Sequence, residues 1–326
     1  MQNWQPSASL SRLKERADFL RDIRLFFAKR QIMEVDTPLL CQGVATDPCL
    51  QAFAVNVKNK SQPPLFRYLQ TSPEYAMKRL VAAGSGPIYY LGKAFRFEEL
   101  GKKHNPEFTM LEWYRPSWDH LALIAEVNTL MQELIGTAPA VVATYAELFL
   151  KYFKINPHLA EKSELRDIAI TNQWAGESDF LEFDKDAWLD LLMSHGIEPH
   201  LGKTEPLVVT DYPASQASLA KTRTIEGPNP YLVAERFEFY FKGIELANGY
   251  HELSCAKEQA QRFDEDLQKR QAQGLAQLPI DQYLLDALQA GFPPCAGVAL
   301  GVDRLLMLKT GENDIANVIP FGWERA

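Results

Sequence analysis

The chain has 326 residues, a formal net charge of −8 from 34 Lys+Arg against 42 Asp+Glu, and 46% hydrophobic residues. This composition predicts a soluble globular protein with a sizeable core and excludes a disordered chain. No uninterrupted apolar run reaches the roughly 18 residues of a membrane helix, and the first residues lack a signal-peptide pattern, so we expect a cytoplasmic protein. The acidic total argues against nucleic acid as the main partner and suits a cationic substrate.

The four cysteines predict neither a disulfide scaffold nor a zinc or redox site. No two of Cys41, Cys49, Cys255 and Cys295 have the C-x-x-C spacing, and we expect ordinary buried thiols. The six histidines show no metal-ligand spacing, so none is assigned to a metal.

The first third of the chain combines one helix with several strands. Apolar residues recur every three or four positions from Ser9 to Lys29, which predicts an amphipathic helix, and a short alternating strand ending in proline follows at 32–38. Three aromatic runs separated by turn-prone segments then predict an antiparallel meander, at 65–70, 88–97 and 108–114.

The rest of the chain combines further helices and strands with one insertion. Asp119 is expected to cap a helix that ends before Gly136, and Thr144 with Glu147 has the capping-box pattern. Residues 138–206 read as a helical and irregular insertion. Further on we expect strands at 207–210 and 236–253, a helix at 256–273 stopped by Gly274, and a glycine-spaced strand, turn and helix around 297–308.

One segment superficially resembles a phosphate-binding loop but is excluded. Gly202-Lys203-Thr204 follows Gly196 with five residues between the glycines instead of four, and Pro206 stands where a helix should begin. Any nucleotide is therefore expected to bind elsewhere.

Two arginines have the chemistry of phosphate ligands. Arg96, followed by Glu98, ends a predicted strand, and its guanidinium offers a bidentate fork, although an exposed cross-strand ion pair is the alternative. Arg304 begins the last predicted helix, where a phosphate could bind, and its alternative is a surface arginine.

Three glutamates recur seven residues apart in the aromatic strand region, at Glu238, Glu245 and Glu252. On one straight strand this spacing alternates the faces, so a bulge or bend at Gly243 or Gly249 is needed to bring them together. Carboxylate oxygens are the ligands of Mg²⁺, while the alternative is a set of solvated strand charges.

Taken together, three of these segments resemble one family in the correct order. The unit at 32–38, Phe95-Arg96-Phe97-Glu98 and the segment 297–304 are similar to motifs 1, 2 and 3 of class II aminoacyl-tRNA synthetases. Residues 104–114 and 245–253 resemble the lysyl-tRNA synthetase subgroup. The resemblance implies an α+β fold in which an antiparallel sheet is flanked by helices, forming a single catalytic domain over 1–326 with the insertion at 138–206.

The sequence departs from lysyl-tRNA synthetases in two respects. The motif 1 helix begins within about ten residues of Met1, so we expect no N-terminal OB-fold anticodon-binding domain. Ala299 stands where motif 3 usually has glycine, and its methyl group would reshape the amino-acid pocket. Both departures resemble the stand-alone paralogues that act as elongation factor P (R)-β-lysine ligases. This implies an ATP-dependent ligase that makes a β-lysyl-adenylate and transfers the acyl group to a lysine side chain of elongation factor P.

The same resemblance implies a role for individual residues. Arg96 and Arg304 are the catalytic residues, on the α-phosphate with the substrate carboxylate and on the γ-phosphate respectively, and Asn105 and Phe108 receive the adenine. The full set of residues expected at ATP is Arg96, Glu98, Asn105, Phe108, Glu245, Leu246, Gly301 and Arg304. Mg²⁺ is expected at Glu238 and Glu245. The diammonium substrate is expected at Ser72, Glu74, Glu112, Tyr114, Asn248, Glu252 and Ala299.

Two alternatives remain open from the sequence. One is a truncated lysyl-tRNA synthetase that still charges tRNA, which the expected lack of an anticodon domain and the acidic charge disfavour. The other is a non-catalytic regulatory paralogue, whose signature would be loss of Arg96, Glu98, Glu245 or Arg304, and all four are present. Because motif 1 forms the dimer interface in this class, the resemblance also implies a homodimer.

Overall fold

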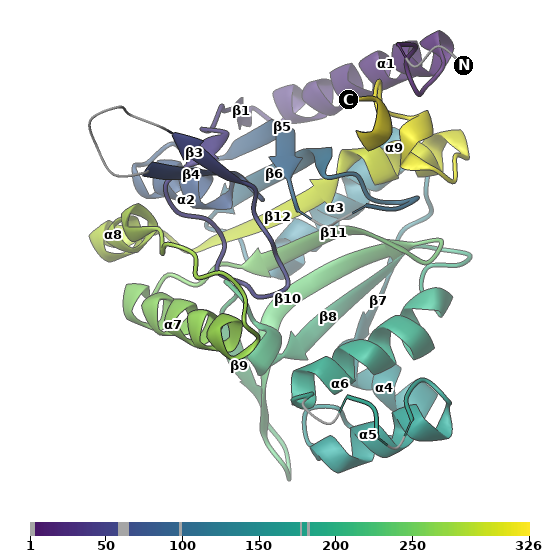
Figure 1. Ribbon diagram of the computed structural model, residues 1–326, viewed down its shortest axis with the longest axis vertical. Coiled ribbons are helices and arrows are strands. Elements are labelled where there is room, and N and C mark those ends of the chain that lie inside the picture. The colour runs from purple at the N-terminus through teal and green to yellow at the C-terminus, as the bar shows by residue number, and fades with distance from the viewer. Residues whose placement is uncertain (1–3, 58–64, 98–99, 177, 181–182) are drawn as a thin grey trace. The chain divides into compact units, whose positions relative to one another are not determined.

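A computed structural model of the protein describes residues 4–57, 65–97, 100–176, 178–180 and 183–326 (Figure 1). The chain divides into two compact units. Unit 1 comprises Met1–Trp118, Glu133–Ile135 and Leu253–Ala326, and unit 2 comprises Asp119–Gln132 and Gly136–Glu252. None of the helices in the described ranges combines the length and the apolar character that a membrane crossing requires.

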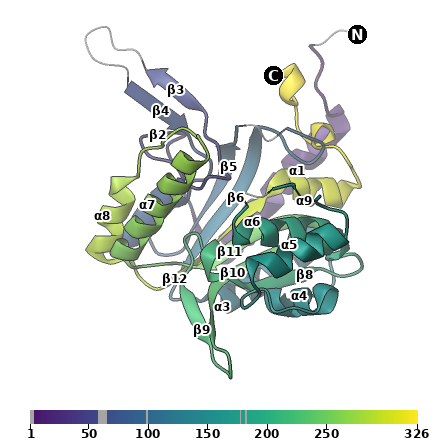
Figure 2. The ribbon, with the colours of Figure 1, turned by 60° about the horizontal axis from the view of Figure 1, so that its bottom comes forward.

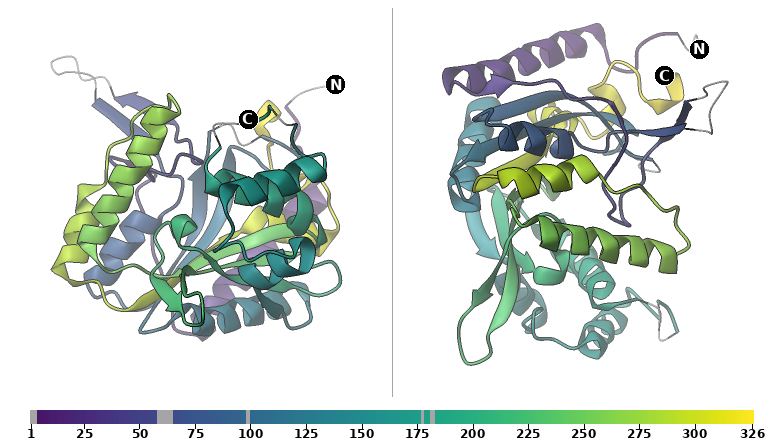
Figure 3. Two further views of the ribbon diagram at one scale, coloured as in Figure 1. Left: turned by 90° about the horizontal axis from the view of Figure 1, so that it is seen from below. Right: turned by 90° about the vertical axis from the view of Figure 1, so that its left-hand side faces the viewer.

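The main sheet of unit 1 carries the motif 1 helix on its surface. Its strands follow the order β1 (Met33–Glu34), β5 (Ile88–Phe95), β6 (Glu107–Pro116) and β12 (Cys295–Gly301), and β1 alone runs parallel to its neighbour. Helix α1 (Leu10–Lys29), which Ser9 caps as predicted, lies along these strands (Figure 3). Phe27 stacks on Tyr89 with ring centroids 4.4 Å apart and meets Trp113 edge-on at 5.4 Å.

A second, smaller sheet and three helices form another part of unit 1. The sheet has the order β2 (Leu40–Cys41), β4 (Leu65–Leu69), β3 (Ala54–Val57). Helix α2 (Glu74–Ala82) packs on α8 (Gln282–Gly291), and α8 lies beside α7 (Ala256–Ala272) (Figure 2). The expected meander is therefore wrong for 65–70, because helix α2 separates β4 from β5 and the strand pairs with β2 and β3 instead.

Unit 2 is built on a sheet with the order β11 (Ile244–His251), β10 (Tyr231–Phe241), β8 (Leu207–Pro213) and β7 (Val141–Thr144), with β9 (Thr222–Ile225) also on β10. Helix α3 (His120–Ile135), whose last residues belong to unit 1, begins at its predicted cap Asp119 and ends at Gly136 with φ +70°. These two ends follow from the side-chain oxygen of the cap and from the left-handed conformation that glycine adopts easily.

The region expected to be helical and irregular, 138–206, holds helices α4 (Tyr145–Phe153), α5 (Lys162–Thr171) and α6 (Lys185–Leu192), which lie together in Figure 1. The predicted capping box of Thr144 and Glu147 is present at α4. One element was missed, because β7 is only four residues long and pairs parallel with β8. Trp188, Phe149 and Leu192 form part of the core of this region. Its origin as an insertion into a single domain stays a prediction.

The structure confirms the predicted helix before Gly274 and the predicted strand and helix near the C-terminus, and it corrects the prediction for the cysteines. Helix α7 stops before Gly274 (φ +70°), and β12 leads directly into α9 (Val302–Thr310). The expectation of four buried thiols is wrong for Cys49 and Cys255, which are exposed. Both lie outside strands and helix interiors, in a turn and at the cap of α7, where the backbone runs over the surface.

Candidate active site

Glu112 lies at the centre of the predicted substrate residues of unit 1. It is 2% exposed and sits on β6 opposite Ala299 of β12. Ser72 donates to its Oε2 at 2.6 Å, and Tyr114 donates to its Oε1 at 2.8 Å. Residues directly opposite each other share one face of an antiparallel sheet, so the methyl group of Ala299 is beside this carboxylate. Four of the predicted substrate residues are thus brought together.

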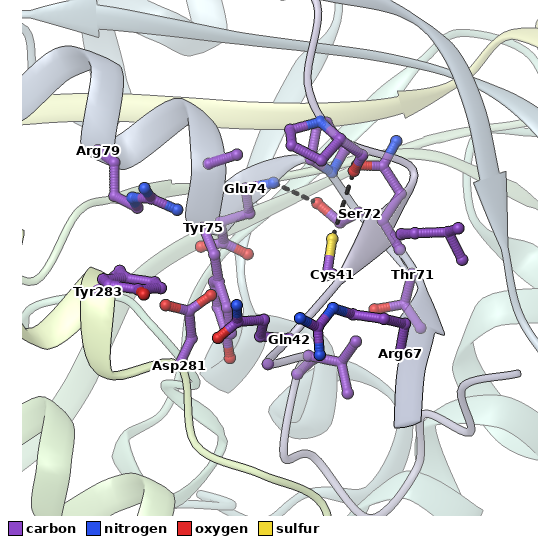
Figure 4. A pocket seen from close by; sticks show the side chains of 18 residues that line it. Cys41, Gln42, Arg67, Thr71, Ser72, Glu74, Tyr75, Arg79, Asp281 and Tyr283 are labelled. Atoms are coloured by element: carbon purple, nitrogen blue, oxygen red, sulfur yellow. Dashed lines mark hydrogen bonds between the residues drawn. The ribbon is translucent and has the colours of Figure 1, made fainter. Parts of the chain in front are cut away.

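Glu74 lines a pocket of about 240 Å³ in unit 1 that β2, β4 and α2 help to form (Figure 4). Its backbone N–H donates to Ser72 Oγ at 3.0 Å, so Ser72 connects Glu74 to Glu112. The pocket wall also carries Arg67, Arg79 and Asp281, which gives it charges of both signs. The pocket therefore has charged residues of both signs and a predicted substrate carboxylate at its wall.

Arg96 and Phe108 lie against each other at the end of β5 and the start of β6. The guanidinium carbon of Arg96 is 5.3 Å from the centroid of the Phe108 ring, and its backbone N–H donates to Pro106. Such a contact helps to orient the guanidinium, whose planar fork of donors matches the geometry of a phosphate. Glu98, the other predicted residue of this motif, lies outside the described residues.

Arg304 follows Gly301 in the first turn of α9. Its Nη2 contacts His104 Nε2, and its Nε donates to the carbonyl of Lys103 at 3.3 Å. The neighbouring Asp303 is 2% exposed and anchors this turn, because Arg16 donates to its Oδ1 at 2.6 Å and the N–H of Thr109 donates to its Oδ2 at 2.7 Å. Helix α1, strand β6 and the segment 297–304 therefore meet at one buried carboxylate.

Asn105, expected at the adenine, already uses both ends of its amide within unit 1. Its Nδ2 donates to the carbonyl of Glu107 at 2.7 Å, and its Oδ1 accepts from the N–H of Trp323 at 2.9 Å. These bonds fix the loop before Phe108 and the C-terminal segment. A hydrogen bond from Asn105 to the adenine stays a prediction, as does stacking of the base on Phe108.

In unit 2 the spacing of the three glutamates is resolved by a hairpin and a bulge. Strands β10 and β11 turn at Lys242 and Gly243, both with positive φ. Glu238 lies opposite Asn248, whereas Tyr240 lies opposite Glu245, so the register skips one residue of β11. The bend at Gly243 is confirmed, and the bulge falls at Leu246 instead of Gly249. This extra residue places Glu245 on the same face as Glu238 and Asn248.

Glu238 is the most heavily bonded of these carboxylates. Its Oε2 accepts from Tyr212 at 2.6 Å and from Tyr240 at 2.5 Å, and Arg236 donates to its Oε1 at 2.5 Å. Burial, together with this charge, raises the pKa of both tyrosines well above the usual value. The hydroxyls therefore remain donors at all physiological pH values, and Arg236 adds a charge-assisted hydrogen bond to the carboxylate.

The other predicted residues of unit 2 lie on or just after β11. Asn248 has a buried Oδ1 that finds no hydrogen-bond partner among the described residues. Glu252 is 1% exposed and pairs in an isolated bridge with Ala220, while Glu245 is half-buried. A buried amide oxygen of this kind costs free energy unless a ligand or water donates to it.

The structure adds partners that the sequence reasoning missed. Lys78 lies with its Nζ 2.7 Å from Glu74 Oε1, and the i, i+4 spacing on a helix was the available signal. His120, Glu235 and His251 also form a group whose candidate ligand atoms lie within 4.8 Å of one another, although their sequence positions share no motif. Glu235 contacts Nδ1 of His251 at 2.6 Å and Lys221 contacts its Nε2 at 3.1 Å, so we assign no metal to this group.

The chain is similar in sequence to known proteins. The family model described as tRNA synthetases class II (D, K and N) matches residues 3–325. Relatives named elongation factor P–(R)-beta-lysine ligase, from Salmonella typhi, Salmonella paratyphi B and Salmonella heidelberg, are each 50% identical to this chain over 324 residues. These alignments cover 99% of this chain and 98% of each relative.

Proposed function

Because the chain belongs to the family of class II tRNA synthetases (D, K and N), we propose that it is an ATP-dependent ligase that activates (R)-β-lysine and transfers it to a lysine of elongation factor P. The observation that carries the choice of substrate is the 50% identity, over nearly the full length of both chains, to relatives named for this reaction. The buried carboxylate of Glu112, oriented by two hydroxyl donors, supports a substrate that carries an ammonium group.

In the first step, a carboxylate oxygen of β-lysine attacks the α-phosphorus of ATP. The bond to the β-phosphate oxygen breaks, pyrophosphate leaves, and a β-lysyl-adenylate remains. Arg96 neutralises charge on the α-phosphate and holds the carboxylate, while Arg304 holds the γ-phosphate. This step depends on positioning and charge neutralisation, which fits two fixed guanidinium groups.

The adenine stacks on Phe108, and Asn105 orients the loop that presents this ring. Glu98, Leu246 and Gly301 complete the expected ATP contacts. Because glycine lacks a side chain, Gly301 lets the nucleotide approach the start of α9 closely.

The two ammonium groups of β-lysine are bound by carboxylates. In unit 1 these are Glu112, with Ser72 and Tyr114 as its donors, and Glu74 at the pocket wall. In unit 2 the residues are Asn248 and Glu252. The amide oxygen of Asn248 is an acceptor for an ammonium proton, which would satisfy a buried atom that lacks a partner among the described residues.

Mg²⁺ fits the donors of Glu238 and Glu245, which lie on neighbouring strands of unit 2 and offer hard oxygen ligands. Glu238 Oε1 accepts one hydrogen bond from Arg236 and keeps a second lone pair. When bound, the ion neutralises phosphate charge. The chain's own contribution is to hold the Glu238 carboxylate in one orientation through Arg236, Tyr212 and Tyr240.

In the second step, an uncharged lysine amine of elongation factor P attacks the acyl carbonyl carbon. The bond to the adenylate oxygen breaks, AMP leaves, and the amine loses a proton as the amide forms. The acceptor is thus a protein amine and not tRNA. We also propose a homodimer in the cytoplasm, as the resemblance and the composition imply.

Intact-mass spectrometry of elongation factor P, incubated with the enzyme, ATP and (R)-β-lysine, tests this function. We expect a mass increase of one lysyl residue on a single lysine, which requires ATP and disappears with the Arg96→Ala enzyme. Parallel incubation with tRNA should give no acid-insoluble label. Charging of tRNA with no change in elongation factor P would contradict the proposal.

A further inference from the structure

The structure places a buried cation directly behind one of the two substrate carboxylates of unit 1. Lys78 is 1% exposed and lies one helical turn after Glu74 on α2. Its Nζ is 2.7 Å from Glu74 Oε1, and Oε1 is itself a buried atom. The side chain of Glu74 retains 16% exposure and lines the pocket, so its outer part faces the space that Lys78 does not reach.

The ion pair with Lys78 offsets the cost of removing the Glu74 carboxylate from water before the substrate binds. An ionised carboxylate removed from water is costly unless a cation or several donors compensate it. Lys78 supplies that charge from inside the protein, and the position of Glu74 in the first turn of α2 adds a favourable interaction with the helix N-terminus. The charge of Lys78 therefore compensates the Glu74 carboxylate before the substrate binds.

The same contact fixes the direction in which Glu74 points. Its backbone N–H donates to Ser72 Oγ, which in turn donates to Glu112, so the first turn of α2 is tied to the Glu112 site. Lys78 holds the side chain of this turn, while Ser72 holds its backbone. Without the ammonium, the side chain of Glu74 would lose the contact that sets its direction.

We infer that Lys78 is a positioning residue, which holds the side chain of Glu74 directed into the pocket so that it can bind one ammonium group of the β-amino-acid substrate. The inference rests on the proposed function for the identity of the substrate. Lys78 acts through Glu74 and makes no contact with the substrate itself. Its loss should therefore change substrate binding more than the rate of the chemical step.

The test is ATP–pyrophosphate exchange driven by (R)-β-lysine, which measures the first step without the partner protein. We expect Lys78→Met to raise KM for β-lysine about tenfold, as for the loss of one charge-assisted contact, and to change kcat by less than about threefold. Lys78→Arg, which keeps the charge, should retain nearly the parental KM.

Arg262→Met is the matched control, because Arg262 pairs with Glu258 four residues earlier on a helix of the same unit. It should leave KM unchanged. The Glu74→Gln variant and the Glu74→Gln/Lys78→Met double variant should share one KM to within about threefold, because the proposed effect of Lys78 on KM acts through the Glu74 carboxylate. This pair carries the test if Lys78→Met fails to fold.

The inference is overturned if Lys78→Met lowers kcat by as large a factor as it raises KM. It is also overturned if the double variant has a much higher KM than Glu74→Gln. A different result would affect the proposed function: if the parental enzyme shows no exchange with (R)-β-lysine, the substrate assignment is wrong. The two failures are distinguishable because the parental enzyme is assayed first.

Discussion

Glu112 in unit 1 and Glu238 in unit 2 are both buried carboxylates that accept tyrosine hydroxyls, yet they are compensated differently. Ser72 and Tyr114 donate to Glu112 through neutral hydroxyl groups. Glu238 accepts from two tyrosines and also from Arg236, whose charge balances its own. The comparison indicates that hydroxyl donors orient both carboxylates, while Glu238 also belongs to a network in which Arg236 balances its charge.

The largest effect is expected from Glu112→Gln. The amide keeps the shape of the side chain but removes the charge that attracts the ammonium group, and it presents N–H donors to groups that themselves donate. We expect kcat/KM for β-lysine in pyrophosphate exchange to fall about 10³-fold, with a small change in thermal stability. A fall of less than about tenfold would show that this carboxylate is not a substrate ligand.

Glu238→Gln should lower stability, in addition to the loss of activity that its proposed Mg²⁺ role implies. Removing this carboxylate leaves the half-buried Arg236 without its carboxylate partner, and breaking a largely buried ion pair in this way costs up to about 3–5 kcal/mol. Urea unfolding followed by circular dichroism would measure the loss. A double variant with Arg236→Met should recover part of it, and equal losses for the single and double variants would contradict the balanced network.

Arg96→Ala tests the charge neutralisation on which the first step depends. We expect adenylate formation to fall at least about 10²-fold, by analogy with the loss of one preorganised donor to a developing anion. The ring of Phe108 remains in place, so KM for ATP should change less than kcat. Pyrophosphate exchange at a near-parental rate would rule out this role.

Ala299→Gly should have a smaller effect, confined to selectivity. The methyl group lies beside Glu112 across the β6–β12 pair, where it narrows the floor of the site. One methyl group is worth about 1 kcal/mol, so the ratio of kcat/KM for β-lysine to that for α-lysine should shift about five- to tenfold. If the ratio stays the same, Ala299 does not select the isomer.

His158 extends the comparison to a buried base in unit 2. Both ring nitrogens are buried and lack a hydrogen-bond partner among the described residues, and burial lowers the pKa of this histidine from 6.5 to about 4. Its ring stacks on Tyr231 with centroids 4.6 Å apart. Because the folded pKa is depressed, the unfolded chain binds the extra proton between these values.

Stability should therefore fall as the pH drops from about 6.5 to about 4, by up to ~1.4 kcal/mol per pH unit. His158→Phe keeps the stack but cannot be protonated, so urea unfolding of this variant should depend less on pH across that interval. Above pH 7 the two proteins should have the same pH dependence. Parallel curves at all pH values would show that His158 does not contribute to acid sensitivity.

The sequence could predict the parts of the fold that depend on local chemistry. Caps at Ser9, Asp119 and Thr144 are in place because side-chain oxygens satisfy the first N–H groups of a helix wherever they occur. Strand partners depend on distant residues, so the pairing of 65–70 was predicted wrongly. The bulge at Leu246 likewise results from the pairing of β10 with β11, which no single segment reveals.

The candidate site shows the same division. Family resemblance identified Glu112 and its donors, and the geometry brings Ser72, Glu112 and Tyr114 into contact. The resemblance did not identify Lys78 or the Arg236 contact to Glu238, because a sequence does not show which charged side chains are removed from water. The cations that contact these carboxylates could therefore be found only from the structure.

The central claim is that the Glu112 site recognises a second ammonium group, and ATP–pyrophosphate exchange with a matched pair of substrates tests it directly. The pair is (R)-β-lysine and the β-amino acid of the same length whose terminal ammonium is replaced by a methyl group. We predict that the parental enzyme exchanges with β-lysine and shows at least about a 10³-fold lower kcat/KM with the neutral analogue. Comparable exchange with both compounds would contradict the account.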